Sequence, residues 1–94
     1  INRGTVQNII GEFDGAVESF SLAIALRPTD DSLYANRANS YIGLRDAQNA
    51  IADLTTAIEL APDNGEYYFR RGRLYEALSI IDKRRAGELG FTAP

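Results

Sequence analysis

Residues 31–64, DSLYANRANSYIGLRDAQNAIADLTTAIELAPDN, contain the clearest structural pattern of the chain. From about Asp31 to Gly43, small and aromatic side chains recur at spacings of four and three, which is the period of one face of an α-helix. A second helical pattern follows from Ala47 to Leu60, and Asp46 is its expected N-cap. Pro62 ends this pattern because proline cannot continue a helix. The stretch therefore predicts two antiparallel helices joined by a tight turn.

The pattern of this stretch recurs along the chain. When the chain is shifted against itself by 34 residues, the first unit supplies five identities: Ala16, Ala23, Ile24, Leu26 and Pro28 align with Ala50, Ala57, Ile58, Leu60 and Pro62. The same shift aligns the second unit with a third: Tyr34, Arg37, Tyr41 and Leu44 align with Tyr68, Arg71, Tyr75 and Leu78. A fixed period of this length indicates supersecondary units stacked side by side.

Some positions keep their chemical character from unit to unit. One position of each first helix is small: Gly4, Ala38 and Gly72. Another is arginine: Arg3, Arg37 and Arg71. The small residues let helix axes approach closely, and we expect the recurring tyrosines to fill the space between helices. We interpret the arginines as structural, with the stem covering neighbouring helices and the head reaching water or a carboxylate such as Asp53.

The combination of Tyr34, Ala38, Tyr41, Ala50, Leu54, Ala57 and Pro62 in one 34-residue unit resembles the tetratricopeptide repeat family, with tyrosine where tryptophan is commoner. The resemblance covers most of the chain. It implies an all-α fold, a right-handed α-α superhelix (solenoid) of about three helix-turn-helix repeats. We expect a single domain, 1–94, with repeat 1 at 1–30 lacking its opening residues, repeat 2 at 31–64, repeat 3 at 65–91 and a tail at 92–94. The second helix of repeat 3 is expected to be irregular, because Arg84 stands where small Ala16 and Ala50 stood.

Composition excludes several classes of protein. The 94 residues include neither cysteine nor histidine, so no disulfide, thiolate nucleophile or usual zinc site is expected, and no cofactor is indicated. The formal net charge of -3 disfavours nucleic-acid binding. No apolar run approaches the ~20 residues of a membrane helix, and no signal peptide opens the sequence, so we expect a soluble, cytoplasmic protein without membrane insertion. The start at Ile1 suggests a piece of a longer chain.

Polar residues on the first helices form rows from repeat to repeat, opposite the apolar stripe. One row is Asn2, Asn36 and Arg70, and the next is Thr5, Asn39 and Arg73. In tetratricopeptide repeats the first helices line the concave groove, so the resemblance implies that these rows form its floor. Asparagine can hydrogen-bond a peptide backbone, and arginine presents a fork suited to carboxylates. We hypothesise that the floor binds an extended, acidic or C-terminal peptide of a protein partner, with Asn36 and Asn39 on its backbone and Arg70 and Arg73 on its carboxylates. Phe69 and Ile9 would add apolar contacts.

Four alternatives stay open. In the first alternative, the polar rows are only solvated helix surface and bind nothing. In the second, the chain is similar to co-chaperones that clamp the acidic tails of heat-shock chaperones: Asn36 and Arg70 match that branch, but Ile1, Thr5 and Glu66 replace the expected lysine, asparagine and lysine. In the third, the chain forms a homo-oligomer through exposed repeat ends. The fourth, an enzyme, is disfavoured because the acidic residues are scattered and no catalytic pair is indicated.

Overall fold

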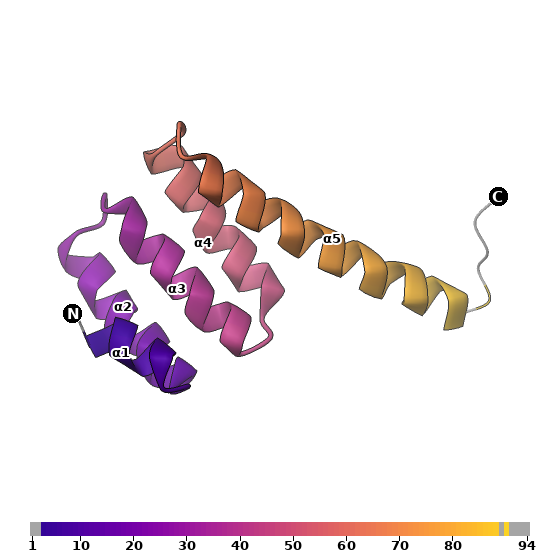
Figure 1. The fold of residues 1–94 in the computed structure, drawn as a ribbon, viewed down its shortest axis with the longest axis horizontal. Coiled ribbons are helices and arrows are strands. Elements are labelled where there is room, and N and C mark those ends of the chain that lie inside the picture. Colours follow the sequence, from indigo (N-terminus) through magenta and orange to yellow (C-terminus); the bar gives the residue numbers. More distant parts are fainter. Residues whose placement is uncertain (1–2, 89, 91–94) are drawn as a thin grey trace.

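The computed structural model describes residues 3–88 and 90, which form five α-helices and, within these residues, no strand (Figure 1). The helices are α1 (Arg3–Ile9), α2 (Phe13–Leu26), α3 (Asp31–Gly43), α4 (Ala47–Leu60) and α5 (Gly65–Glu88). The predicted all-α repeat fold is confirmed. Both helices of the central unit, α3 and α4, have the bounds that the sequence pattern indicated.

Aspartate side chains close the N-termini of α3 and α4. The Asp30 Oδ1 accepts a hydrogen bond from the Ser32 backbone amide at 3.1 Å, and the Asp46 Oδ1 accepts one from the Asn49 amide at 3.2 Å. Each bond satisfies an amide that the first helical turn leaves without an internal partner. The prediction that Asp46 caps α4 is therefore confirmed.

The core consists of layers between successive helices. One buried cluster joins α2 to α3 and contains Ala16, Phe20 and Leu33. A larger one joins α3, α4 and α5 and contains Ala35, Ala38, Ala50, Leu54, Ala57, Ile58 and Tyr67. Small residues permit this packing: a Cβ added at Gly4 would lie only 2.8 Å from the Phe20 Cζ. Each unit thus depends on its neighbours for burial, as stacked repeats do.

The last helix does not follow the pattern of the central unit. In Figure 1, α5 runs back along α4 without a break and continues past the beginning of α4, away from the other helices. The turn of the central unit uses Gly43 and the N-cap Asp46, but Ala77 and Ile80 occupy the equivalent positions of the third unit. Both are compatible with a continuing helix. Within the described residues, the expected irregular second helix of repeat 3 is therefore replaced by a continuation of the first.

Candidate functional site

Polar contacts hold the three first helices, α1, α3 and α5, side by side. From α1, the Asn8 Nδ2 donates a hydrogen bond to the Asn36 carbonyl oxygen at 3.3 Å, and the Asn8 Oδ1 accepts one from the Ser40 Oγ at 2.7 Å. From α5, the Arg70 Nη2 donates to the Ala35 carbonyl oxygen at 3.2 Å. Because both sets of bonds meet on α3, the three helices share one polar surface. We call it the first-helix face and define it by Thr5, Asn8, Asn36, Asn39, Ile42, Arg70 and Arg73.

Arg70 crosses this face from α5 to α3. Besides its bond to Ala35, its Nη2 donates to the Oδ1 of Asn39. The Nη1 lies 3.9 Å from the Glu66 Oε1, beyond hydrogen-bond distance. The guanidinium that we expected to bind a peptide carboxylate is therefore anchored by two neutral oxygens, with a carboxylate of its own chain nearby.

A depression of about 270 Å³ lies between α3 and α5 on the first-helix face. It is lined by Ile42, Arg70, Arg73 and Leu74, so two apolar side chains alternate with two cations. The Arg73 guanidinium lies 5.9 Å from the centre of the Phe69 ring, on which it can stack as a cation on an aromatic face. Phe69 itself is 65% exposed. The depression can accommodate an apolar side chain next to an acidic group.

The structure brings together only some of the predicted site residues. Asn36, Asn39, Arg70 and Arg73 lie on the first-helix face. Phe69 lies at its edge on α5, and its other neighbours line a separate hollow described below. Thr5 is half-buried on α1, and Ile9 is exposed at the end of that helix. Asn2 lies outside the described residues. The role of all these residues in peptide binding stays a prediction.

Sequence reasoning missed two residues of this face, Asn8 and Ile42, and a further residue of the depression, Leu74. Asn8 and Ile42 form the next row of the same 34-residue ladder, one helical turn beyond Thr5 and Asn39. Extending the rows by three residues would have found both. Leu74 belongs to the apolar side of α5 and reaches the depression only because α5 packs against α3 and α4.

The recurring arginine of the central unit has a structural role. The Arg37 Nε and Nη2 donate to the two carboxylate oxygens of Asp53 at 2.8 and 2.7 Å, and the Nη1 donates to the Ser21 Oγ at 3.1 Å. The guanidinium also lies 5.9 Å from the ring centres of both Tyr34 and Tyr41. The hydrogen bond to Asp53 raises the pKa of Arg37 above its ordinary value. The expected pairing with Asp53 is confirmed.

A buried tyrosine fastens α5 to the start of α3. Tyr67 is buried, and its hydroxyl donates to the Asp31 Oδ2 at 2.7 Å. Burial, together with this hydrogen bond, raises the pKa of Tyr67 to about 12. Since α5 carries Arg70 and Arg73, this contact helps to fix the site.

Paired antiparallel helices that repeat every 34 residues, with one polar face shared by the first helices, define a helical-repeat protein. The central unit, residues 31–64, matches the family model described as "Tetratricopeptide repeat". The chain belongs to the tetratricopeptide repeat family, and its repeats form a protein–protein interaction module.

Several curated proteins are similar to this chain. The "Protein STIP1 homolog" of Dictyostelium discoideum is 32% identical over 91 residues, which are 96% of this chain and 16% of that protein. The "Protein SGT1 homolog" of Oryza sativa subsp. japonica is 35% identical over 82 residues, 86% of this chain and 22% of that protein. The "Hsp70-Hsp90 organizing protein" of Triticum aestivum is 34% identical over 76 residues, 81% of this chain and 13% of that protein. The chain thus spans less than a quarter of each of these relatives.

The described residues contain neither a candidate metal-ion cluster nor a candidate membrane-spanning helix. Their acidic side chains include no group of three or more that could hold a metal ion. No helix among them is both long enough and apolar enough to cross a membrane.

Proposed function

We propose that this chain binds an extended peptide of another protein along the first-helix face, and that it prefers a peptide with acidic residues. The observation that carries the proposal is the depression between α3 and α5, where Arg70 and Arg73 flank Ile42 and Leu74. An extended peptide places successive side chains on opposite sides, so one apolar and one acidic side chain can enter the depression while the backbone stays accessible.

Each polar residue has a distinct role in this proposal. The Asn39 amide accepts from Arg70 through its Oδ1, so its Nδ2 can donate to a peptide carbonyl. Arg73 is exposed and can turn from the Phe69 ring to a carboxylate. Arg70 is half-buried and already bonded, so it supplies a fixed positive charge near the peptide. We assign the larger share of direct carboxylate contact to Arg73.

A second candidate is the acidic C-terminal tail of a heat-shock chaperone. It is favoured by the relatives, one of which is named an Hsp70-Hsp90 organizing protein. It is disfavoured by Glu66, which stands where the tail-binding branch is expected to have lysine and whose carboxylate lies 3.9 Å from the Arg70 Nη1. A like charge there repels a terminal carboxylate. The two candidates differ in whether the peptide needs a free C-terminus.

Fluorescence anisotropy with labelled ten-residue peptides tests both. The peptides would be acidic, neutral or basic, each with a free or an amidated C-terminus. We expect the acidic peptides to bind most tightly, with affinity falling as salt rises. Arg73→Ala should weaken this binding about tenfold, which corresponds to the ~1.5 kcal/mol of one hydrogen bond to a charged group.

Arg27→Ala is the matched control, because Arg27 is an exposed arginine after α2, in another part of the array. It should leave the affinity unchanged. Equal binding of acidic and basic peptides, or equal losses for the two variants, would remove the proposed site. A strict need for a free C-terminus would favour the chaperone-tail candidate instead. Non-enzymatic action, the absence of nucleic-acid partners, homo-oligomerisation through repeat ends and a cytoplasmic location stay predictions.

A further inference from the structure

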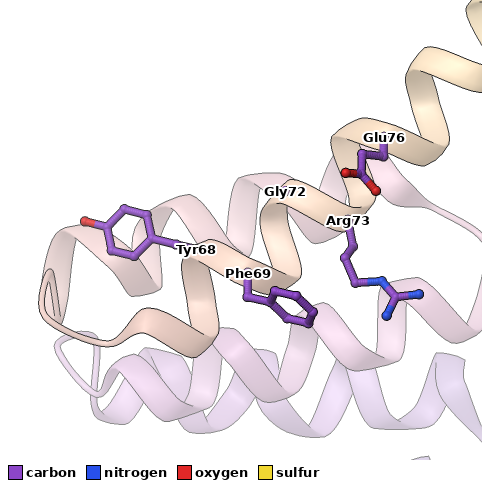
Figure 2. Close-up of a pocket in the computed structure, with 5 residues that line it drawn as sticks. All are labelled: Tyr68, Phe69, Gly72, Arg73 and Glu76. Carbon is purple, nitrogen blue, oxygen red and sulfur yellow. The ribbon is translucent and has the colours of Figure 1, made fainter.

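One face of α5 carries the residues of a helix–helix interface, but no helix of the described residues packs on it. A hollow of about 380 Å³ adjoins this face, and the residues that line it are Tyr68, Phe69, Gly72, Arg73 and Glu76 (Figure 2). Tyr68 and Tyr75 are 44% and 52% exposed. A Cβ added at Gly72 would meet no atom within 4 Å. We call this surface, defined by Tyr68, Arg71, Gly72 and Tyr75, the open face.

The same positions in the preceding repeat are covered. Tyr34, Ala38 and Tyr41 lie 34 residues before Tyr68, Gly72 and Tyr75, and they pack against the small and apolar residues Ala50, Leu54 and Ala57 of α4. Ala38 is 0% exposed as a result. The molecule therefore contains its own example of what a face of this composition binds, namely the small-residue side of an antiparallel α-helix.

The arginine of the open face shows which charge is missing. The Arg71 Nη1 donates to the Thr55 Oγ1 at 3.2 Å, just as the Arg37 Nη1 donates to Ser21, and Thr55 is the residue 34 positions after Ser21. Arg71 also lies 5.8 and 6.0 Å from the Tyr68 and Tyr75 ring centres, as Arg37 lies between its own two tyrosines. The two arginines differ in one contact: Arg37 is paired bidentately with the Asp53 carboxylate. Among the described residues, no carboxylate oxygen lies within 4.0 Å of Arg71.

The third repeat of this chain lacks the residues needed to cover its own open face in the same way. Three of the α4 residues that contact or pair with α3 are Ala50, Asp53 and Leu54, and their equivalents 34 positions later are Arg84, Gly87 and Glu88. A large cation replaces the small contact, the pairing carboxylate is absent, and an acid replaces the buried leucine. Moreover, α5 continues as one helix through these positions.

We propose that the open face of α5 binds an α-helix of another protein. That helix carries small residues that pack over Gly72 and, three residues after the first of them, an aspartate that pairs bidentately with Arg71. The partner thus takes the place that α4 takes on α3. The two sites adjoin, because Arg73 lines both the hollow and the depression, but this one is centred on Gly72 and Arg71 and requires a helical rather than an extended ligand.

The probe is a synthetic helix that copies α4, residues 46–62 of this chain. Because an isolated helix of this length is marginally stable in water, it is cross-linked between positions 48 and 52, both exposed in α4. The labelled probe is titrated against the full 94-residue chain. We expect saturable binding, weakened about tenfold in a probe with Asp53→Asn, which keeps the shape but removes the charge.

Substitutions in the protein locate the binding. Gly72→Leu places a large side chain in the open space, where its Cβ meets no atom within 4 Å, and should abolish probe binding while circular dichroism and urea unfolding remain native. Gln48→Leu adds the same side chain to an exposed position of α4 and is the matched control. Arg71→Glu should abolish binding of the original probe and restore it for a probe with Asp53→Arg.

Three results would overturn the proposal. The first is no saturation with the probe at about 1 mM, the range of negligible affinity. The second is equal probe binding by the Gly72→Leu and Gln48→Leu proteins, which would place the probe elsewhere, for example in exchange with α4. The third is a concentration-dependent dimer in light scattering that Gly72→Leu converts to monomer. In that case a second copy of the chain, rather than a separate partner helix, covers the open face.

Discussion

The two equivalent arginines provide an internal test of what the buried ion pair contributes to stability. Arg37 and Arg71 occupy the same repeat position. Each lies between the two equivalent tyrosines of its own helix and donates a hydrogen bond to one hydroxyl of the preceding helix. They differ in that Arg37 pairs with Asp53, which is 5% exposed. Replacing each arginine with methionine preserves most of the apolar stem, so the difference between the two variants isolates the carboxylate pairing.

The expected loss in the free energy of unfolding follows from the Asp53 carboxylate, which Arg37→Met leaves without its partner. An ion pair that loses one buried partner costs ~3–5 kcal/mol, because the remaining charge has no compensation. Since the Arg37 side chain keeps 21% of its accessible surface, water can reach the site in part, and the lower end, about 3 kcal/mol, applies. Arg71→Met removes a single hydrogen bond and should cost about 1 kcal/mol.

Urea unfolding followed by circular dichroism measures this difference. With a denaturant slope of roughly 1–3 kcal/mol per molar, the Arg37 variant should unfold at a urea concentration about 1 M lower than the Arg71 variant. Equal midpoints for the two variants would refute the reasoning, because the pairing with Asp53 would then contribute nothing net. A larger loss for Arg71→Met would reverse the assignment of which arginine is structural.

Two further predictions use other positions. Gly72→Ala should raise the free energy of unfolding by roughly 0.5–1 kcal/mol in urea, because it improves helix propensity in open space. Gly4→Ala should lower the free energy of unfolding by ~1–3 kcal/mol, because its Cβ would lie 2.8 Å from the buried Phe20 ring. Stabilisation by both substitutions would contradict the close contact between Gly4 and Phe20. Since the pKa of Tyr67 is raised to about 12, the native state keeps a proton that the unfolded state loses from about pH 10. Stability should therefore fall between these values by up to about 1.4 kcal/mol per pH unit, and Tyr67→Phe should flatten this slope in an alkaline series of urea titrations.

The central repeat could be predicted almost entirely from sequence because its signals are local. The Asp46 side chain caps α4 by accepting a hydrogen bond from the backbone amide three residues later, and Pro62 follows the end of that helix. The pairing of Arg37 with Asp53 could also be expected, since the repeat period fixes how the two helices face each other. In the third repeat, the loss of the turn residues could be read from the sequence. That the chain would then continue as a helix, rather than turn irregularly, was not evident from it.

The candidate site was less predictable. The sequence placed Asn39 and Arg70 in different rows of the ladder, whereas the structure joins them across α3 and α5. A long side chain can reach a neighbouring row, and spacing alone does not say which one. Spacing is equally insufficient for Phe69. Its repeat position in α3 is occupied by the buried Ala35, whereas Phe69 is exposed on α5, where the described part of the chain places no further helix beside it.

By itself, the sequence determined the period, the helix ends of the central unit and the small, aromatic and arginine positions of each interface, because these depend on contacts within one or two helical turns or on a repeated spacing. Which of these interfaces are filled became known from the packing of the helices. Arg37 and Arg71 are the same residue in the same local pattern, yet one is paired with Asp53 and the other is not, because α4 folds back over α3 and nothing in the described chain folds back over α5. An arginine at this position forms an ion pair only if a second helix packs over it, and the packing of that helix depends on residues distant from the arginine in the sequence.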